Sequence, residues 1–450
     1  MSEIREKIYH AYKAAAGLLI VFASSSAWCE NMPQGVGIVQ YGFRQMGSTS
    51  NEYDESGNQV ALGSRFDKNF DGPSLLNNPQ GDLGRLVQEL RRYEETTGQT
   101  GLVDRLSLGT LRGEVEARVT AQVLGVACGV GRGFALFVGA PLVDARVDTT
   151  LRVEGENTAQ QLRDELGDFV FSELDTGLQR AAQFSVTDVE NEIDAKGYED
   201  YRSWQRTGFG DLRLGVRREE RWTIPIVGRI SQVWSSAWIL PTGYREDSDH
   251  LTDFSFGKGT HQLALETTVQ GQMPQVPEGR LRLGLGGSYN AATTKTVRLP
   301  EGDESLVDRS RTTQVNWDRG EEFSSFVGVG WETTSWGAMA DFGFDQKGAD
   351  QYSGQAVGNY EALEQGTNEQ RSWARLGVSH SSVDAYRRGR SPIPFMVELS
   401  AFDTVTGHNT REETFVELKL STFFTTRAMT RSRNAPRRSG SNKAVTTASR

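Results

Sequence analysis

The segment Leu111–Leu124 reads LRGEVEARVTAQVL, and its apolar and polar side chains alternate almost without a break. Odd positions from 111 to 123 carry Leu, Gly, Val or Ala, and even positions from 112 to 122 carry Arg, Glu, Thr or Gln; Leu124 is the first exception. A period of two predicts a β-strand with one apolar and one polar face. The run is long enough to supply the roughly 9–11 residues that cross a bilayer at a tilt. We therefore expect a barrel strand with its apolar face toward lipid and its polar face toward the lumen. The alternative is a soluble β-sheet with a wet polar face.

The amino terminus predicts export. Arg5, Lys7 and Lys13 precede the unbroken apolar run 14–23, and a small-residue cleavage site follows at 25–27. This order is typical of a secretory signal peptide, to which we assign residues 1–27. A lipid-modified Cys29 is the alternative, but Trp28 stands where lipid-attachment signals carry a small residue.

Composition narrows the class of protein. The chain has 450 residues, a mean hydropathy of −0.50 and a net charge of −10. A negative mean hydropathy is compatible with a membrane barrel, because half of each strand and all of the loops are polar. Residues 425–450 are basic and rich in Ser, so we expect a disordered tail there. The acidic remainder argues against nucleic acid as a partner.

Alternating segments recur along the chain and predict an all-β, antiparallel up-and-down transmembrane barrel over 28–424, with about twelve strands and a range of twelve to fourteen. The predicted strands are 36–46, 111–124, 143–153, 211–217, 229–240, 261–270, 280–289, 323–331, 338–344, 372–380, 395–401 and 415–424. Short and long connections alternate between them, as expected for periplasmic turns and extracellular loops. Helical spacing in 82–97 and in the long connection 155–208 predicts helical extracellular insertions. The last strand ends on Phe424, which resembles the sorting signal of outer-membrane barrels.

Three passages resemble a known family. They are GFGDLRLG at 208–215, AWILPTG at 237–243 and VACGVGRGFALFVGAPL at 126–142. They are similar to outer-membrane transporters associated with phenol meta-pathway degradation, which are loosely related to fatty-acid and aromatic-hydrocarbon channels. The resemblance implies a non-enzymatic barrel in the bacterial outer membrane that passes small, often apolar or aromatic molecules. Its expected partners are outer-membrane lipid, the barrel-assembly machinery and a small-molecule solute, with no cofactor.

Charged residues at the polar positions of the strands are predicted to line the lumen. They are Arg112, Glu114, Glu116, Arg118, Asp144, Arg146, Asp148, Arg213, Arg217, Glu266, Arg280, Arg282, Asp341, Arg375, Glu398, Glu417 and Lys419. Their mixed signs suit a hydrated pore whose charges tune selectivity, or a salt-bridged and largely filled interior. A hairpin centred near Gly131 would place Arg118 opposite Asp144 and Glu116 opposite Arg146 inside the lumen.

Enzymatic chemistry has little support in the sequence. The five histidines, at 10, 250, 261, 380 and 408, show no metal-ligand spacing. His380 and Ser382 resemble the arrangement of outer-membrane phospholipases, but His380 falls toward the periplasmic end, whereas those enzymes work from the outer leaflet. We therefore expect no catalytic residue and no metal. Two functions remain: a channel, or a structural or surface-interaction barrel with a closed lumen. Trp234, Trp238, Trp331 and Trp373 are expected at the membrane interfaces.

Overall fold

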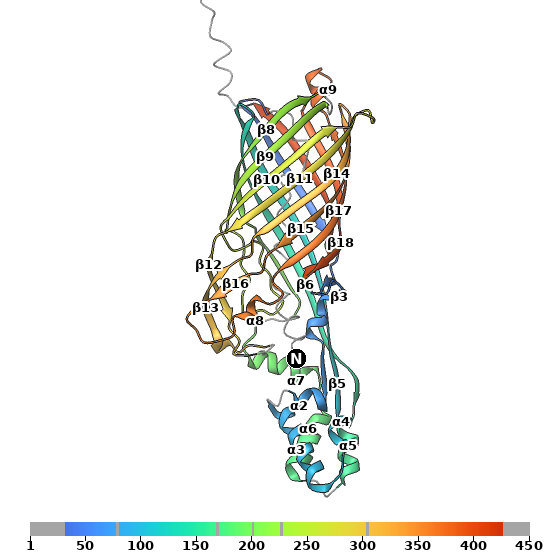
Figure 1. Ribbon diagram of the computed structural model, residues 1–450. Coiled ribbons are helices and arrows are strands. Elements are labelled where there is room, and N and C mark those ends of the chain that lie inside the picture. Colours follow the sequence, from blue (N-terminus) through green and yellow to red (C-terminus); the bar gives the residue numbers. More distant parts are fainter. Residues whose placement is uncertain are drawn as a thin grey trace, which may run out of the picture.

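The computed structural model describes residues 32–77, 81–167, 171–199, 202–225, 228–302 and 306–425. The predicted signal peptide and residues 426–450 of the predicted tail lie outside this part. Tilted antiparallel strands form a closed barrel, from which one pair of strands continues far beyond the rim (Figure 1). Among the described residues, no helix has both the length and the apolar character needed to cross a membrane.

The predicted twelve-stranded antiparallel barrel is confirmed. Each strand pairs with the next along the chain, and pairing of the first with the last closes the sheet. The barrel strands are β1 (Val36–Met46), β5 (Ser107–Gly131), β6 (Phe134–Asn157), β8 (Leu212–Ile224), β9 (Gly228–Leu240), β10 (Gln262–Gln272), β11 (Gly279–Asn290), β14 (Glu322–Glu332), β15 (Trp336–Lys347), β17 (Glu369–Ser381), β18 (Phe395–His408) and β20 (Thr414–Thr425).

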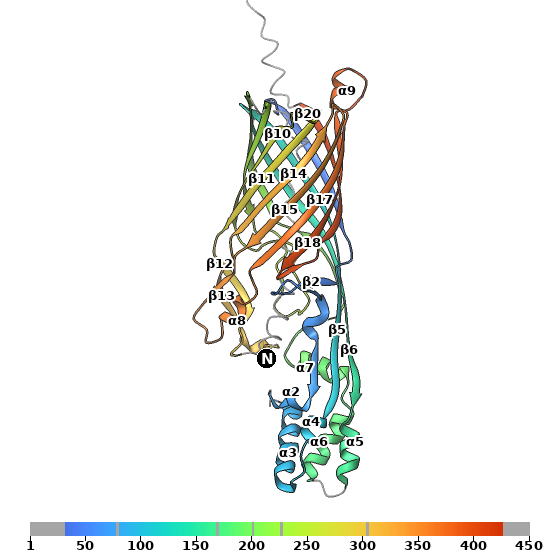
Figure 2. The same cartoon turned by 45° about the vertical axis from the view of Figure 1, so that its right-hand side comes forward.

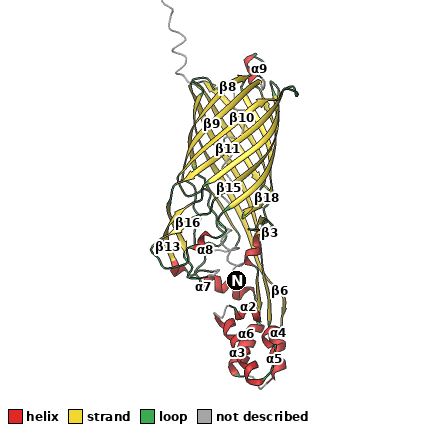
Figure 3. Cartoon of the chain, viewed as in Figure 1, coloured by secondary structure: helices red, strands yellow, loops and turns green. Residues whose placement is uncertain are grey.

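One end of the barrel carries short connections, and we call it the turn end. There the β5–β6 turn is made by Arg132 and Gly133, both with positive φ, as a two-residue hairpin turn requires. A longer turn contains α9 (Val383–Arg387). The opposite end, the loop end, carries the remaining elements (Figure 3). These are β2 (Asn51–Tyr53), β3 (Gln59–Ala61), η4 (Leu62–Phe66), β4 (Lys68–Asp71), α2 (Gly72–Leu76), α3 (Gly81–Thr97), α4 (Leu102–Arg105), α5 (Ala159–Leu166), α6 (Ser172–Ala182), α7 (Val186–Ala195), β7 (Trp204–Phe209), β12 (Thr293–Arg298), η6 (Arg309–Arg311), β13 (Thr312–Asp318), β16 (Gln351–Ser353), α8 (Glu361–Glu364) and β19 (Thr410–Arg411).

The outer wall of the barrel is an apolar belt. Its exposed side chains include Leu124, Val126, Leu136, Val138, Leu214, Leu263, Leu265, Leu281, Leu283, Leu285, Val327, Val329, Phe342, Leu376, Val378, Leu399, Val416 and Leu420. Exposed aromatic residues lie toward both ends, among them Trp238, Tyr289 and Phe323 near the loop end and Trp331 and Trp336 near the turn end. An apolar belt between aromatic girdles is the outer surface of a barrel that lies in a bilayer.

The long hairpin β5–β6 leaves the barrel wall and forms a two-stranded ribbon. β1 pairs with β5 only over 120–128, and β8 pairs with β6 only over 134–139. Farther along, the two strands pair mainly with each other, and we call 108–120 together with 144–157 the ribbon. A helical cap sits at its tip, built from α2 to α6 around a core that includes Leu90, Leu162 and Leu178 (Figure 2).

The segment 111–124 therefore forms a strand, as predicted, but most of it lies outside the barrel. Val119 is only 7% exposed and packs with Phe254 and Phe256 of the 241–261 loop, whereas Leu124, at 59%, is on the outer wall. Even positions thus face outward and odd positions inward, which reverses the expected faces. The physical reason is that a ribbon packed on a loop and wet outside shows the same period of two as a lipid-facing strand. The exception at Leu124 marks where the outward face becomes apolar.

This placement gives a test on the ribbon. Val119→Ala should destabilise the ribbon by about 2 kcal/mol, because two buried methyl groups are lost. Thr120→Ala, on the outward face, should change its stability by less than about 0.5 kcal/mol. Limited proteolysis measures the opening: cleavage of the ribbon should be about thirtyfold faster for Val119→Ala at an opening cost of this size. Equal cleavage of the two variants would contradict the reversed faces.

Candidate functional site: the barrel lumen

The predicted lumen residues divide into two groups. The inner wall of the barrel carries Arg213, Arg217, Glu266, Arg280, Arg282, Asp341, Arg375, Glu398, Glu417 and Lys419. The ribbon carries the others, outside the lumen and on its outward face: Arg112, Glu114, Glu116, Arg118, Asp144, Arg146 and Asp148. This second group corrects the prediction, and the cause is the reversed face described above.

The predicted cross-strand pairs are also wrong. Arg118 lies opposite Arg146, and Glu116 lies opposite Asp148. The hairpin turn falls one residue later than expected, and a shift of one residue in the turn moves the pairing by two positions. Each arginine instead binds a carboxylate two residues away on its own strand, with Arg118–Glu116 at 2.8 Å and Arg146–Asp148 at 3.0 Å.

One side of the lumen is filled by buried ions. We call this set the charge network, and all of its members are buried: Arg44, Arg282, Asp341, Arg375, Glu398, Glu417 and Lys419. Glu417 is its centre, with oxygens 3.3 Å from Arg44, 3.5 Å from Arg375 and 3.0 Å from Lys419. Arg375 also binds Glu398 at 2.9 Å. Buried ions of opposite sign in mutual contact suit a closed part of the wall rather than an open bore.

A second ion pair extends this network along the wall. Arg282 of β11 binds Asp341 of β15 at 2.8 Å, although β14 lies between them. The intervening residue is Gly328, and a Cβ there would overlap the Asp341 carboxylate. Glycine at this position therefore allows the two side chains to meet across the strand. Asp341 in turn lies opposite Arg375 in the sheet, which brings the two parts together.

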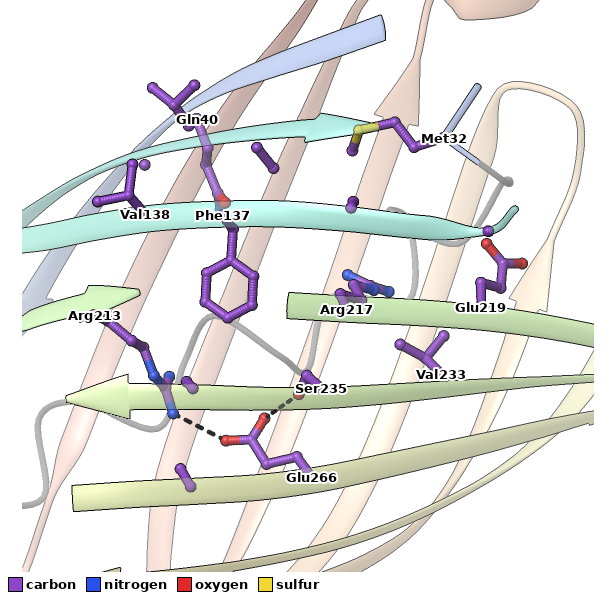
Figure 4. Close-up of a pocket in the computed structure, with 17 residues that line it drawn as sticks. Met32, Gln40, Phe137, Val138, Arg213, Arg217, Glu219, Val233, Ser235 and Glu266 are labelled. Carbon is purple, nitrogen blue, oxygen red and sulfur yellow. Dashed lines mark hydrogen bonds and ion pairs between the residues drawn. The ribbon is translucent and has the colours of Figure 1, made fainter. Parts of the chain in front are cut away.

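The other side of the lumen is lined largely by small residues and contains a cavity. Gly125, Ala127, Ala135, Ala237 and Ala264 lie in its wall, together with Phe137 and Val233. The cavity and the open solvent at its mouth together occupy about 910 Å³. Arg213 lies 3.1 Å from one carboxylate oxygen of Glu266, and the Ser235 hydroxyl donates to the other at 3.4 Å (Figure 4). Free space inside the barrel thus lies beside β5, β6, β8, β9 and β10.

Glu266 connects this cavity with the rest of the lumen. It lines the cavity just described, a second one bordered by Thr410 and Arg411 at the loop end, and a third one bordered by Trp373 and Phe415. The first cavity continues to Met32 and Gly133 at the turn end. Neighbouring cavities that share lining residues follow the lumen from one end of the barrel to the other.

An aromatic row faces the third cavity. We give this name to Phe326, Trp373, Phe402 and Phe415, which contact one another in sequence at ring-centre distances of 6.3, 5.5 and 4.6 Å. Arg44 lies 4.1 Å above the Phe415 ring. Trp373 therefore points inward, which corrects its predicted place at the membrane interface; Trp234, Trp238 and Trp331 are exposed on the outer wall.

The inward residues missing from the prediction share one signal. Trp373 stands two positions from Arg375, Phe402 four from Glu398, and Phe415 two from Glu417, so each shares a face with a predicted lumen residue. The period of two could have placed all three inside. For Trp373, the aromatic character favoured the membrane interface instead. Arg44 and Gln40 could have been found in the same way, because both lie at buried alternate positions of the predicted first strand.

Two of the motifs that carried the family resemblance, GFGDLRLG and AWILPTG, meet at the loop end. Asp211, of the GDLRLG passage, is fully buried and accepts hydrogen bonds from the amides of Gly243 and Lys258, at 2.9 and 2.6 Å. Burial raises the pKa of the Asp211 carboxyl, and these two amides act in the opposite direction. Gly243 ends the LPTG passage. Asp211 thus holds the loop whose Lys258 borders the second cavity.

Among the residues that the structure describes, no group of His, Cys, Asp and Glu side chains is placed to hold a metal ion.

Comparison with known proteins finds solved structures that are similar to this chain in shape. No family model and no curated protein matches the chain. The outer-membrane channel COG4313 from Pseudomonas putida F1 matches with a TM-score of 0.49 and 9% identity, covering 89% of this chain and all of that one. The P. putida toluene transporter TodX matches with a TM-score of 0.30 and 7% identity, covering 92% and 93%. The translocator domain of the autotransporter NalP from Neisseria meningitidis matches with a TM-score of 0.33 and 10% identity, covering 89% and 92%.

Proposed function

We propose that this protein is a bacterial outer-membrane channel through which small molecules diffuse passively. The observation that carries the proposal is the set of cavities that share Glu266 and follow the lumen from the loop end to the turn end. In this reading the apolar belt lies in the outer membrane, the loop end faces the outside and the turn end faces the periplasm. The path runs beside the small residues of β5 to β10, and the third cavity extends from it to Arg44, Arg375 and Glu417 of the charge network.

The residues that line the path suit apolar or aromatic solutes that carry few polar groups. The aromatic row offers ring faces, on which planar apolar groups stack favourably. Arg213 and Glu266 offer polar contacts that are already satisfied by each other, so a solute need not strip water from a free charge. Phe137, Val233 and Ala237 continue an apolar surface toward the turn end.

Flux in a reconstituted system tests the proposal. Planar bilayers containing the purified barrel should show discrete conductance steps, and vesicles containing it should take up small solutes faster than empty vesicles. Complete absence of conductance and of solute uptake would favour the alternative function, a structural or surface-interaction barrel. The specific observation behind that alternative is the ribbon with its helical cap, which projects far from the barrel.

Glu266 gives a selectivity test. A unit charge at about 4 Å is worth ~1 kcal/mol even in water, so Glu266→Lys should lower the cation-to-anion permeability ratio by about fivefold or more. Glu266→Gln removes one charge with little change in shape and should give a smaller shift in the same direction. Glu220→Lys, on β8 and outside the cavities described, is the control and should leave the ratio unchanged. Reversal potentials in a salt gradient measure the ratio; equal ratios in all three variants would place the path elsewhere.

A further inference from the structure

The outward face of the ribbon is a continuation of the lipid-facing wall. On β5 the even positions Val130, Val126 and Leu124 are exposed and apolar, and farther along the same strand face stand Arg118 and Glu116. No turn separates the two parts. The charged side chains therefore point sideways, over the lipid surface next to the barrel, rather than upward into bulk water.

The strand β7 shows where along the ribbon the outward face changes from apolar to charged. Phe209, which is exposed, lies opposite Leu142 of β6, and Gln205 lies opposite Arg146, four residues farther along. Four residues of a strand span roughly 13 Å. Arg146 and its partner Arg118 thus stand above an aromatic anchor of the kind found at membrane interfaces, at the level of the lipid head groups.

Charges of like sign face each other across the ribbon. Arg118 lies opposite Arg146, Glu116 opposite Asp148, and Arg112 opposite Arg152. Like charges directly opposite each other destabilise a pair of strands. Bonds along each strand offset part of this repulsion, but the Arg118 and Arg146 side chains remain 57% and 55% exposed. Two guanidinium groups, which we call the Arg118–Arg146 row, therefore lie next to two carboxylates, those of Glu116 and Asp148.

Arg118 and Arg146 are each bound through Nε and Nη2 by one carboxylate of their own strand, yet more than half of each side chain stays exposed. The Ser48 hydroxyl donates to Glu116, and Gln205 and Thr207 donate to Asp144, so the adjacent elements contact carboxylates. Guanidinium groups bind phosphate through two parallel hydrogen bonds. The carboxylate row suits the divalent cations that accompany phosphate groups in a lipid surface.

From this face we propose that the ribbon binds the phosphorylated glycolipid of the outer leaflet, with its phosphate groups on the Arg118–Arg146 row and their divalent counter-ions beside Glu116 and Asp148. The inference rests on the proposed placement in the outer membrane. It adds a lipid-binding surface to the channel and gives the long ribbon a fixed position against the membrane.

Binding of purified rough lipopolysaccharide to the delipidated full-length barrel, in detergent with Mg²⁺, tests this proposal. Arg118→Gln combined with Arg146→Gln should weaken binding about tenfold or more, because two charge-assisted contacts to phosphate are lost. The matched control is Arg218→Gln combined with Arg388→Gln. These arginines, with side chains 48% and 57% exposed, also bind nearby carboxylates of their own segment, Glu220 and Asp384, but at the turn end. The control should bind within twofold of the native protein.

Two further measurements keep the result interpretable. Heat-modifiable gel migration should show that both double variants are folded, and the conductance of both should equal that of the native barrel. Intact conductance with weakened glycolipid binding supports the inference, whereas equal binding by the native protein and the Arg118/Arg146 variant overturns it. Loss of conductance in the native protein would instead count against the proposed function. Phosphatidylglycerol vesicles form a second arm, on which we expect no difference between the variants.

Discussion

Glu417→Ala is expected to destabilise the inserted barrel by about 3–5 kcal/mol, the cost of breaking a buried ion pair by removing one partner. The substitution leaves Arg44, Arg375 and Lys419 buried with one fewer carboxylate among them. Reversible unfolding in lipid vesicles, followed by tryptophan fluorescence, measures the change in the free energy of unfolding.

The matched control is Glu332→Ala. Glu332 binds Arg280 at 2.8 Å at the turn end, and both side chains are well exposed. An exposed pair contributes at most about 1 kcal/mol. If Glu417→Ala costs no more than Glu332→Ala, water reaches the charge network and that side of the lumen is open.

The second large effect is expected on the lipid face. Leu285→Arg on β11 should destabilise the barrel by about 2–4 kcal/mol if it lies at the midplane of the bilayer. Leu285 is 56% exposed on the apolar belt, near the middle of its strand. The cost arises because a guanidinium group loses its hydration in hydrocarbon.

The same side chain placed on the inner wall gives the control. Thr268 lines a lumen cavity and lies beside Thr267, the residue opposite Leu285. Thr268→Arg should therefore cost much less, because its guanidinium enters a cavity that the carboxylates of Glu266 and Glu417 also line, and not hydrocarbon. Equal destabilisation by the two variants, measured by unfolding in vesicles, would show that the faces of β10 and β11 are not lipid and lumen.

The sequence predicted strand number and pairing direction well, because the alternation recurs in twelve separated segments and the connections differ in length. It could not tell which part of a long strand lies in the membrane. In β5 the same period of two covers 111–119, above the barrel, and continues into the wall from 120 onward. Only the change of character at Leu124 separates the two, and that change is a single residue in the sequence.

The lumen was predictable to the extent that charge marks the inner face. The predicted lumen residues of β8 to β20 lie on the inner wall, because lipid excludes charged side chains from the outer one. Aromatic residues such as Trp373 can lie on either face of a barrel strand. Their position in the alternation, and not their residue type, decides whether they face lipid or lumen. Contacts such as Arg282–Asp341 could not be predicted, since they depend on a glycine in the strand between the two partners.

Neighbouring serines on β9 allow the central claim, a water-accessible path along the inner wall, to be tested most directly. Ser235 lines the cavity beside Glu266, and Ser236 has the opposite parity and pairs with Leu265 of the apolar belt. Single Ser235→Cys and Ser236→Cys variants, in a background without the native cysteines, are treated with a charged, water-soluble thiol reagent during conductance recording. The structure predicts that the reagent lowers the conductance of Ser235→Cys and leaves Ser236→Cys unchanged. No effect on Ser235→Cys, or an equal effect on both variants, would contradict a path along this wall.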